Sequence, residues 1–378
     1  MSITFCGILI YAGVATFSLL YILKQKNDLL FEKLDSVHWA FLIYISAFSL
    51  SALINTGTGK AFHVFSRTCQ DYFVFLWAIS VVCNLNNNNK YKSYETLKAF
   101  ILFSGIISVS YGLCQYFHFD IFHRQSDLNR LSGFHKNPYS YGGQLIIFFF
   151  LFLNELITTR SKFITKFFLF ILLIAALFCI LHTFERAIIF GIIPGVIAYL
   201  LLSKCNLKTL LLPLSAILPA AFIIISLNQK LYKRLINTFI NLNNRPNARF
   251  KLWNIALSVW KRNLFFGVSE FPKVIHDPGG GLKVQVLSHA HNVYLQMLVT
   301  HGIVGLLAFL NLFVAIFKTL LSNTNSKYVI CLLSVLFSFL LEGIFEYFWG
   351  DSEVRYLLLY FMGFVFGHFK SANYTVNS

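Results

Sequence analysis

The stretch Ser288–Gly305, SHAHNVYLQMLVTHGIVG, joins a short polar segment to the start of a long apolar one. Beyond Asn292 no Lys, Arg, Asp or Glu occurs until Lys318, and an apolar run of that length can cross a bilayer as a helix. His289 and His291 therefore lie where a polar loop meets a membrane helix. A histidine there reaches water and is held by a rigid element, which suits a general base. The alternative is that both are interfacial polar residues that end a loop.

The composition of the chain is that of an α-helical membrane protein. Of the 378 residues 57% are hydrophobic and only 12% are charged, and long apolar runs recur from end to end. These features predict an all-α polytopic membrane protein. The seven cysteines form no C-x-x-C pair, so neither a disulfide framework nor a cysteine-based zinc site is expected. The formal charge of +16 is carried mainly by the loops, which favours anionic membrane lipids over nucleic acid as partners.

The apolar runs predict about 11–12 transmembrane helices, the first of them a retained span rather than a signal peptide. Basic residues recur in every second short loop, and by the positive-inside rule these loops are cytoplasmic. The loops on the outer face are then 55–63, 118–138, 183–186, 228–292 and 346–353. The runs that can be placed are 3–23, 37–54, 64–83, 97–117, 139–158, 164–182, 187–202, 207–227, 293–317, 328–345 and 354–369.

Loop 228–292 is long enough to form a subdomain outside the membrane, and it is strongly basic. Within it, Ala248–Arg262 is expected to form an amphipathic helix, because Phe250, Trp253 and other apolar residues recur at helical spacing. Such a helix lies at the membrane surface or packs on the spans while its lysines reach water. The expected organisation is a bundle of about eight spans at 1–227, the outer loop at 228–292 and a bundle of about three spans at 293–378.

Two arginines share the predicted outer side with His291. Arg186 lies in the short segment between two spans, and a charged group costs about 2–4 kcal/mol at bilayer depth and less near the interface. It is expected to face a cavity or a partner, and the structural alternative is a pair with the neighbouring Glu185. Arg249 lies near the start of the amphipathic helix, where simple solvation is the alternative.

The segment around His291 resembles the O-antigen ligase and O-antigen polymerase family of bacterial envelope glycosyltransferases. His291-Asn292, nine residues and Gly302-Ile303-Val304-Gly305 match the ligase pattern of His-Asn, nine residues and Gly-x-x-Gly. The segment Arg249–Ala256 resembles the family's Arg-x-x-x-Trp-x-x-Ala helix. Gly302 and Gly305 are also small residues of the kind that let membrane helices approach each other closely, so they are expected to serve helix packing.

Two weaker matches lie earlier in the chain. Thr183–Ala187 resembles the family's Thr-x-Ser-Arg-Gly/Ala segment, with Glu185 in place of serine. Arg130 begins a segment that resembles an Arg-x-x-Gly…Pro element and ends at Pro138. The resemblance extends over about residues 130–367 and is strongest over 249–305.

The resemblance implies a GT-C-like glycosyltransferase, closest to O-antigen ligase, in the bacterial inner membrane. It would transfer polysaccharide from undecaprenyl diphosphate to lipid A–core oligosaccharide at the periplasmic face. His291 would be the general base that takes the proton of the acceptor hydroxyl, and Arg186 and Arg249 would bind the diphosphate. No cofactor and no metal is expected, because the chain has no Asp-x-Asp motif and the two histidines lack further ligands at metal spacing. The possible accessory residues are Arg130, Glu185, His289 and Asn292.

Other functions fit parts of the same pattern. An O-antigen polymerase would use the same chemistry with another O-unit as acceptor, and a protein-glycosylating relative would use a protein acceptor. A transporter of lipid-linked sugars is the alternative from a different class. A transporter predicts functional charges distributed through the depth of the membrane, whereas the candidate charges here lie on the outer side.

Overall fold

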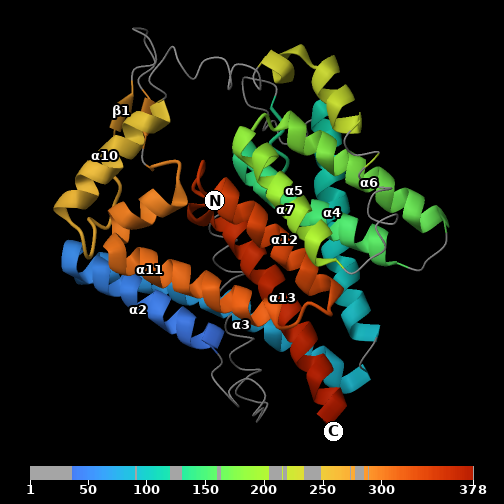
Figure 1. Cartoon of the computed structure of the whole chain (residues 1–378), viewed down its shortest axis with the longest axis horizontal. Helices are drawn as coiled ribbons and strands as arrows, with labels where there is room; N and C mark the ends of the chain where they lie inside the picture. Colours follow the sequence, from blue (N-terminus) through green and yellow to red (C-terminus); the bar gives the residue numbers. More distant parts are fainter. Residues whose placement is uncertain are drawn as a thin grey trace.

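The computed structural model describes residues 36–89, 92–119, 130–159, 163–203, 215, 219–233, 248–272, 274–276, 285–287 and 289–377. Most of these residues are helical, and the elements follow one another as a series of long rods (Figure 1). The long helices are α2 (Ser36–Thr56), α3 (Thr58–Asn89), α4 (Lys92–Tyr116), α5 (Pro138–Thr158), α6 (Phe163–His182), α7 (Arg186–Leu202), α10 (Ala248–Arg262), α11 (Val293–Leu321), α12 (Lys327–Glu342) and α13 (Ser352–Asn377). The short elements are the strands β1 (Val274–His276) and β2 (Gln285–Leu287) and the 3-10 turn η2 (Phe348–Gly350).

The structure confirms the all-α membrane class. Helices α2, α5, α6 and α11 and the segment Lys98–Tyr116 of α4 are long and apolar enough to cross a membrane, and α7 is a shorter apolar helix. Every predicted span between 37 and 202 and between 293 and 369 lies wholly or mostly on one of the helices, and the span 328–345 runs three residues past the end of α12. The predicted span 3–23 lies outside the described residues, and so does much of 207–227. The chain is a multi-pass membrane protein.

Two local predictions were wrong. The outer loop expected at 55–63 is helical, because α3 begins at Thr58 and only Gly57 separates it from α2. Gly57 has φ +79°, a backbone conformation that glycine adopts without strain and that ends a helix abruptly. The second difference is that β1 and β2 form an antiparallel pair within the outer loop, and no strand was expected there.

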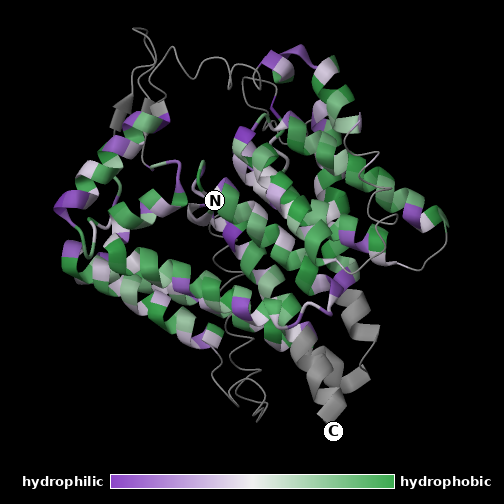
Figure 2. Cartoon of the chain, in the orientation of Figure 1, coloured by the Kyte–Doolittle hydropathy of each residue, from purple (hydrophilic) through white to green (hydrophobic). Residues whose placement is uncertain are grey.

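The helices pack in pairs around a central one. Helix α13 packs along α3, α12 along α7 and α11 along α2, and α5 contacts α4, α6, α7, α12 and α13. The run of phenylalanines in α5, residues 148–150, is fully buried, as expected for a helix that is apolar on all sides. Figure 2 shows hydrophobic residues over most of α5, α11 and α12, whereas hydrophilic residues are interspersed along α10.

The loop that follows α10 is fastened to a kink in α11. Gly302 has φ +66° and ψ −166° inside α11, which interrupts the helical hydrogen bonds there. Ile303 N donates to Leu264 O at 2.9 Å, and Val268 N donates to Val299 O at 2.8 Å. A Cβ on Gly302 would lie 2.2 Å from a carbonyl oxygen of that loop, so both the conformation and the close approach require glycine. These contacts hold α10, which carries Arg249, at a fixed distance from α11, which follows His291.

Gly305, the second glycine of the Gly-x-x-Gly motif, lies at the same kink. A Cβ on Gly305 would lie 2.1 Å from the Cβ of His301, one turn earlier in α11. Both glycines therefore accommodate the bend of α11 and the loop packed on it, and a Cβ on Gly305 would also lie 3.7 Å from Phe48 of α2. Their role in helix packing stays a prediction.

Candidate active site

Asn292 ties the start of α11 to the end of α12. Its side chain caps α11 by accepting a hydrogen bond from Leu295 N at 2.9 Å, and it donates to Ile344 O at 2.9 Å. Next to it, Val293 N donates to Gly343 O at 2.7 Å. An N-cap asparagine satisfies one of the free donors of the helix end. The same residue here also fixes the segment after α12, and this segment carries Glu346.

The residues just before Asn292 are held from two sides. Ala290 is fully buried, its N donates to Gln296 Oε1 at 2.9 Å, and its carbonyl accepts from Trp253 Nε1 of α10 at 3.1 Å. His291 has φ +47°, a left-handed conformation that is strained for a residue with a side chain. The surrounding hydrogen bonds therefore impose the direction in which the His291 ring points.

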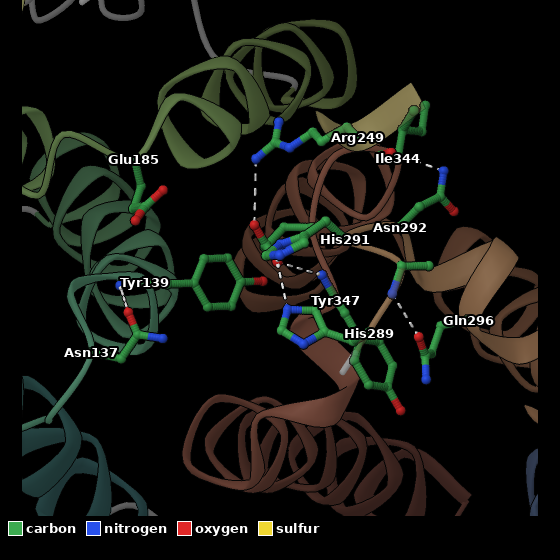
Figure 3. Close-up of polar contacts among 12 residues, drawn as sticks. Asn137, Tyr139, Glu185, Arg249, His289, His291, Asn292, Gln296, Ile344 and Tyr347 are labelled. Carbon is green, nitrogen blue, oxygen red and sulfur yellow. Dashed lines mark hydrogen bonds and ion pairs between the residues drawn. The ribbon is translucent and has the colours of Figure 1, made fainter. Parts of the chain in front are cut away.

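Glu346 is the centre of the candidate site. Its Oε1 lies 2.6 Å from His291 Nδ1 and 3.7 Å from His289 Nε2, and its Oε2 lies 3.5 Å from an Arg249 guanidinium nitrogen. Burial alone would raise the pKa of Glu346, but hydrogen bonds from His289 and His291 and the charges of His291 and Arg249 lower it to about 2. Figure 3 shows His289, His291 and Arg249 gathered in one place. Glu346 is therefore a buried, ionised carboxylate.

This carboxylate defines the chemistry available to His291. A hydrogen bond from Nδ1 to an ionised carboxylate fixes the tautomer that carries its proton on Nδ1. The other ring nitrogen, Nε2, is then the one that can accept a proton, and the carboxylate stabilises the imidazolium that forms. The pair has the arrangement of a base and its orienting acid.

Arg186 lies close enough to Arg249 for their charges to interact. The charged groups that act on the Arg186 guanidinium are Arg249 first and Glu185 second. Glu185 itself forms an ion pair with Arg130, whose Nε donates to Thr183 O at 2.8 Å. Two neighbouring guanidinium groups repel each other, and an anion placed between them relieves that repulsion. Arg186 and Arg249 therefore form a favourable place for an anion, with Arg130 balancing the charge of Glu185.

Three side chains of the described residues could hold a metal ion. The ligand atoms of His289, His291 and Glu346 lie within 4.8 Å of one another. The same carboxylate is also the partner of Arg249, and a guanidinium so close opposes a bound cation. The metal-independent reaction expected from the sequence stays a prediction.

The structure thus brings four of the proposed side chains together and adds one. His291, His289, Arg249 and Arg186 surround a common region, and Arg130 and Glu185 lie behind Arg186 as a pair. Glu346 lies in the outer loop 346–353, whose sequence allows two interpretations, a group that orients His291 or contacts sugar, or an aromatic belt with helix-end charges; its contacts with both histidines favour the first. The only sequence signal was the gathering of acids and aromatics at 346–353.

We predict that Glu346→Gln lowers the activity of this site by about 10–100-fold, the usual cost of losing the partner that orients a functional histidine. The glutamine side chain has the shape of the carboxylate but no negative charge, so it does not fix the His291 tautomer by electrostatic attraction. Because the pKa of Glu346 is about 2, its carboxylate is ionised throughout any assay above pH 4, so the loss is expected at every such pH. The measurement is the reaction rate in membranes at matched protein level.

The control for this substitution is Glu270→Gln. Glu270 is an exposed acid of the outer loop 228–292 that pairs with the exposed Lys60 at 2.8 Å, and exposed pairs contribute little. Equal rates for the two variants would mean that Glu346 does not act through His291.

Comparison with known proteins agrees with this geometry. Residues 168–310 match a family model described as O-antigen ligase, and no curated protein matches the chain. The matched segment runs from α6 into α11, so it contains Arg186, Arg249 and His291 and excludes Arg130 and Glu346. Over residues 168–310, this multi-pass membrane protein is similar to the O-antigen ligase family.

Proposed function

We propose that this protein is an O-antigen ligase. It transfers polysaccharide from undecaprenyl diphosphate to lipid A–core oligosaccharide at the periplasmic face of the bacterial inner membrane, without a metal or other cofactor. The observation that carries the proposal is the convergence of His291, Glu346 and Arg249 within hydrogen-bond or ion-pair distance, with Arg186 beside them. The N-terminal bundle 1–227 and the C-terminal bundle 293–378 hold the lipids, and the periplasmic loop 228–292 supplies Arg249 and His291.

The proposed reaction is a displacement at the anomeric carbon of the donor. The acceptor hydroxyl attacks this carbon while His291 Nε2 takes the hydroxyl proton, and the bond from the carbon to the diphosphate oxygen breaks. A sugar hydroxyl is a weak nucleophile until a base removes its proton. The positive charge gained by His291 is stabilised by Glu346.

The leaving group is undecaprenyl diphosphate, whose negative charge grows as the glycosidic bond breaks. Arg186 and Arg249 stabilise that charge, because fixed guanidinium groups form strong paired hydrogen bonds with phosphate oxygens. A preorganised charge of this kind acts most strongly where water is excluded. The cationic side chains thus take the role that a divalent ion has in many phosphate-leaving reactions.

The acceptor is identified by deleting the gene and separating the lipopolysaccharide on a gel beside the lipid-linked pool. Loss of the ligase is expected to leave bare core and to accumulate lipid-linked polymer. Core that carries a single unit would instead identify an O-antigen polymerase. Unchanged lipopolysaccharide with a changed glycoprotein pattern would point to a protein acceptor, and lipid-linked glycan trapped on the cytoplasmic side would point to transport.

A further inference from the structure

Two buried polar groups beside the candidate site lack hydrogen-bond partners among the described residues. They are the hydroxyl of Tyr139, at the start of α5, and both carboxylate oxygens of Glu342, the last residue of α12. Glu342 is fully buried and Tyr139 is 7% exposed. Buried polar groups in folded proteins are nearly always hydrogen-bonded, so two unsatisfied ones in the same place need an explanation.

Both groups lie against the catalytic carboxylate. Glu346 N donates to the carbonyl of Glu342 at 3.0 Å, so the two acids are one helical turn apart. The Tyr139 hydroxyl faces the Glu342 carboxyl, which acts on it both by charge and as a side-chain partner, and Glu346 is the next acidic group to act on it. In Figure 3 the hydroxyl end of Tyr139 points toward His291. The unsatisfied groups therefore border the place where the acceptor hydroxyl meets the base.

The charges around the pair restrict the ligand. Glu342 is surrounded by Glu346, Glu185 and Asp351, and an anion placed among four carboxyl groups would be repelled. A neutral ligand with hydroxyl groups fits better, because each hydroxyl both donates and accepts a hydrogen bond. The Tyr139 hydroxyl offers a donor and the Glu342 carboxyl offers acceptors. The diphosphate, by contrast, is bound by Arg186 and Arg249 in the proposed reaction.

We infer that Tyr139 and Glu342 bind a hydroxyl group of the sugar ring at the reacting bond. This inference rests on the proposed function, since it names the residues that recognise the sugar in the same site. In the free protein the two groups face each other without a well-formed hydrogen bond, and a hydroxyl of the substrate completes their hydrogen bonds. A site built this way discriminates strongly against a sugar that lacks the hydroxyl, because the buried groups are then left unpaired.

The test is a pair of substitutions that remove the polar atoms and keep the volume, Tyr139→Phe and Glu342→Leu. Removing a buried polar group that has no partner relieves an unfavourable burial, so the melting temperature of each purified variant is expected to stay equal or rise. Transfer is expected to fall by about 10–100-fold, the loss of one or two hydrogen bonds to substrate. A gain in stability together with a loss of activity is the mark of groups retained for function.

The matched control is Tyr141→Phe. Tyr141 is a fully buried tyrosine two residues along α5 whose hydroxyl already donates to Ser108 O at 2.9 Å. Its removal is expected to lower the melting temperature and to leave the transfer rate per folded molecule unchanged. The opposite pattern in the two tyrosines separates a structural hydroxyl from a sugar-binding one.

The assay uses the purified protein with undecaprenyl-diphosphate-linked glycan and lipid A–core from the bacterium that supplies the chain. A rise in KM for the glycan donor assigns the hydroxyl to the donor sugar, and a rise in KM for lipid A–core assigns it to the acceptor. Wild-type kcat/KM in both Tyr139→Phe and Glu342→Leu, or a lowered melting temperature in both, overturns the inference. If His291→Ala is inactive while these variants are fully active, only this inference fails. If His291→Ala is active as well, the proposed function fails with it.

Discussion

Cells whose only copy carries His291→Ala are expected to make lipopolysaccharide with bare core. The substitution removes the base, and general bases contribute about 10²–10⁴-fold to rate, which is enough to erase polymer-bearing bands from a gel. The fold is expected to survive, because Glu346 keeps its contact with Arg249 at 3.5 Å and Asn292 still caps α11. The amount of protein in the membrane is therefore expected to match that of the wild type.

The control for this experiment is His63→Ala, which removes an exposed imidazole of α3. It is expected to leave the lipopolysaccharide pattern unchanged. Polymer attached to core at wild-type level in the His291→Ala strain would remove His291 from the reaction, even if the gene itself proved necessary. If the His291→Ala protein is absent from the membrane, the experiment is repeated with His291→Gln, which keeps a polar side chain of similar size.

The second large effect is expected at the paired guanidinium groups. Replacing Arg249 with alanine removes one of two charges that stabilise the leaving diphosphate, a loss of about 3–4 kcal/mol by analogy with single donors in oxyanion holes. The expected fall in transfer is therefore about 10²–10³-fold. Arg249→Lys keeps the charge but loses the two-pronged geometry, so its rate is expected to lie between those of the alanine variant and the wild type.

Lys251→Ala supplies the comparison for Arg249. Lys251 is an exposed cation two residues further along the same helix, so its loss reports the general effect of reducing positive charge on α10. The measurement is initial transfer rate against concentration of lipid-linked donor. Equal reductions in the two variants would show that α10 contributes only diffuse charge and not a diphosphate contact.

Hydrophobicity and helical periodicity were sufficient to predict most of the fold. The apolar runs locate the membrane helices, and the spacing of Phe250 and Trp253 predicts α10 with the observed bounds Ala248–Arg262. The missed features depend on single residues that break a pattern. Gly57 alone separates two helices, and Gly302 bends α11 so that a loop can pack on it.

The candidate site was predictable only in part, for a similar reason. His291, Arg186 and Arg249 were identifiable because each lies near an expected membrane boundary or within a motif. Glu346 meets His291 across 55 positions of sequence, and no local pattern reports such a contact. Tyr139 was hidden for the opposite reason, since a tyrosine at the start of an apolar helix is unremarkable until its hydroxyl is seen to lack a partner.

The most direct test of the central claim is the rate of a single round of transfer by the purified protein in lipid bilayers. Wild-type protein and His291→Ala are each mixed with undecaprenyl-diphosphate-linked glycan and lipid A–core, and product is followed over time. The account predicts that the variant still binds donor and that its rate of product formation falls by a factor of at least about 10². Equal rates for the two proteins would contradict it.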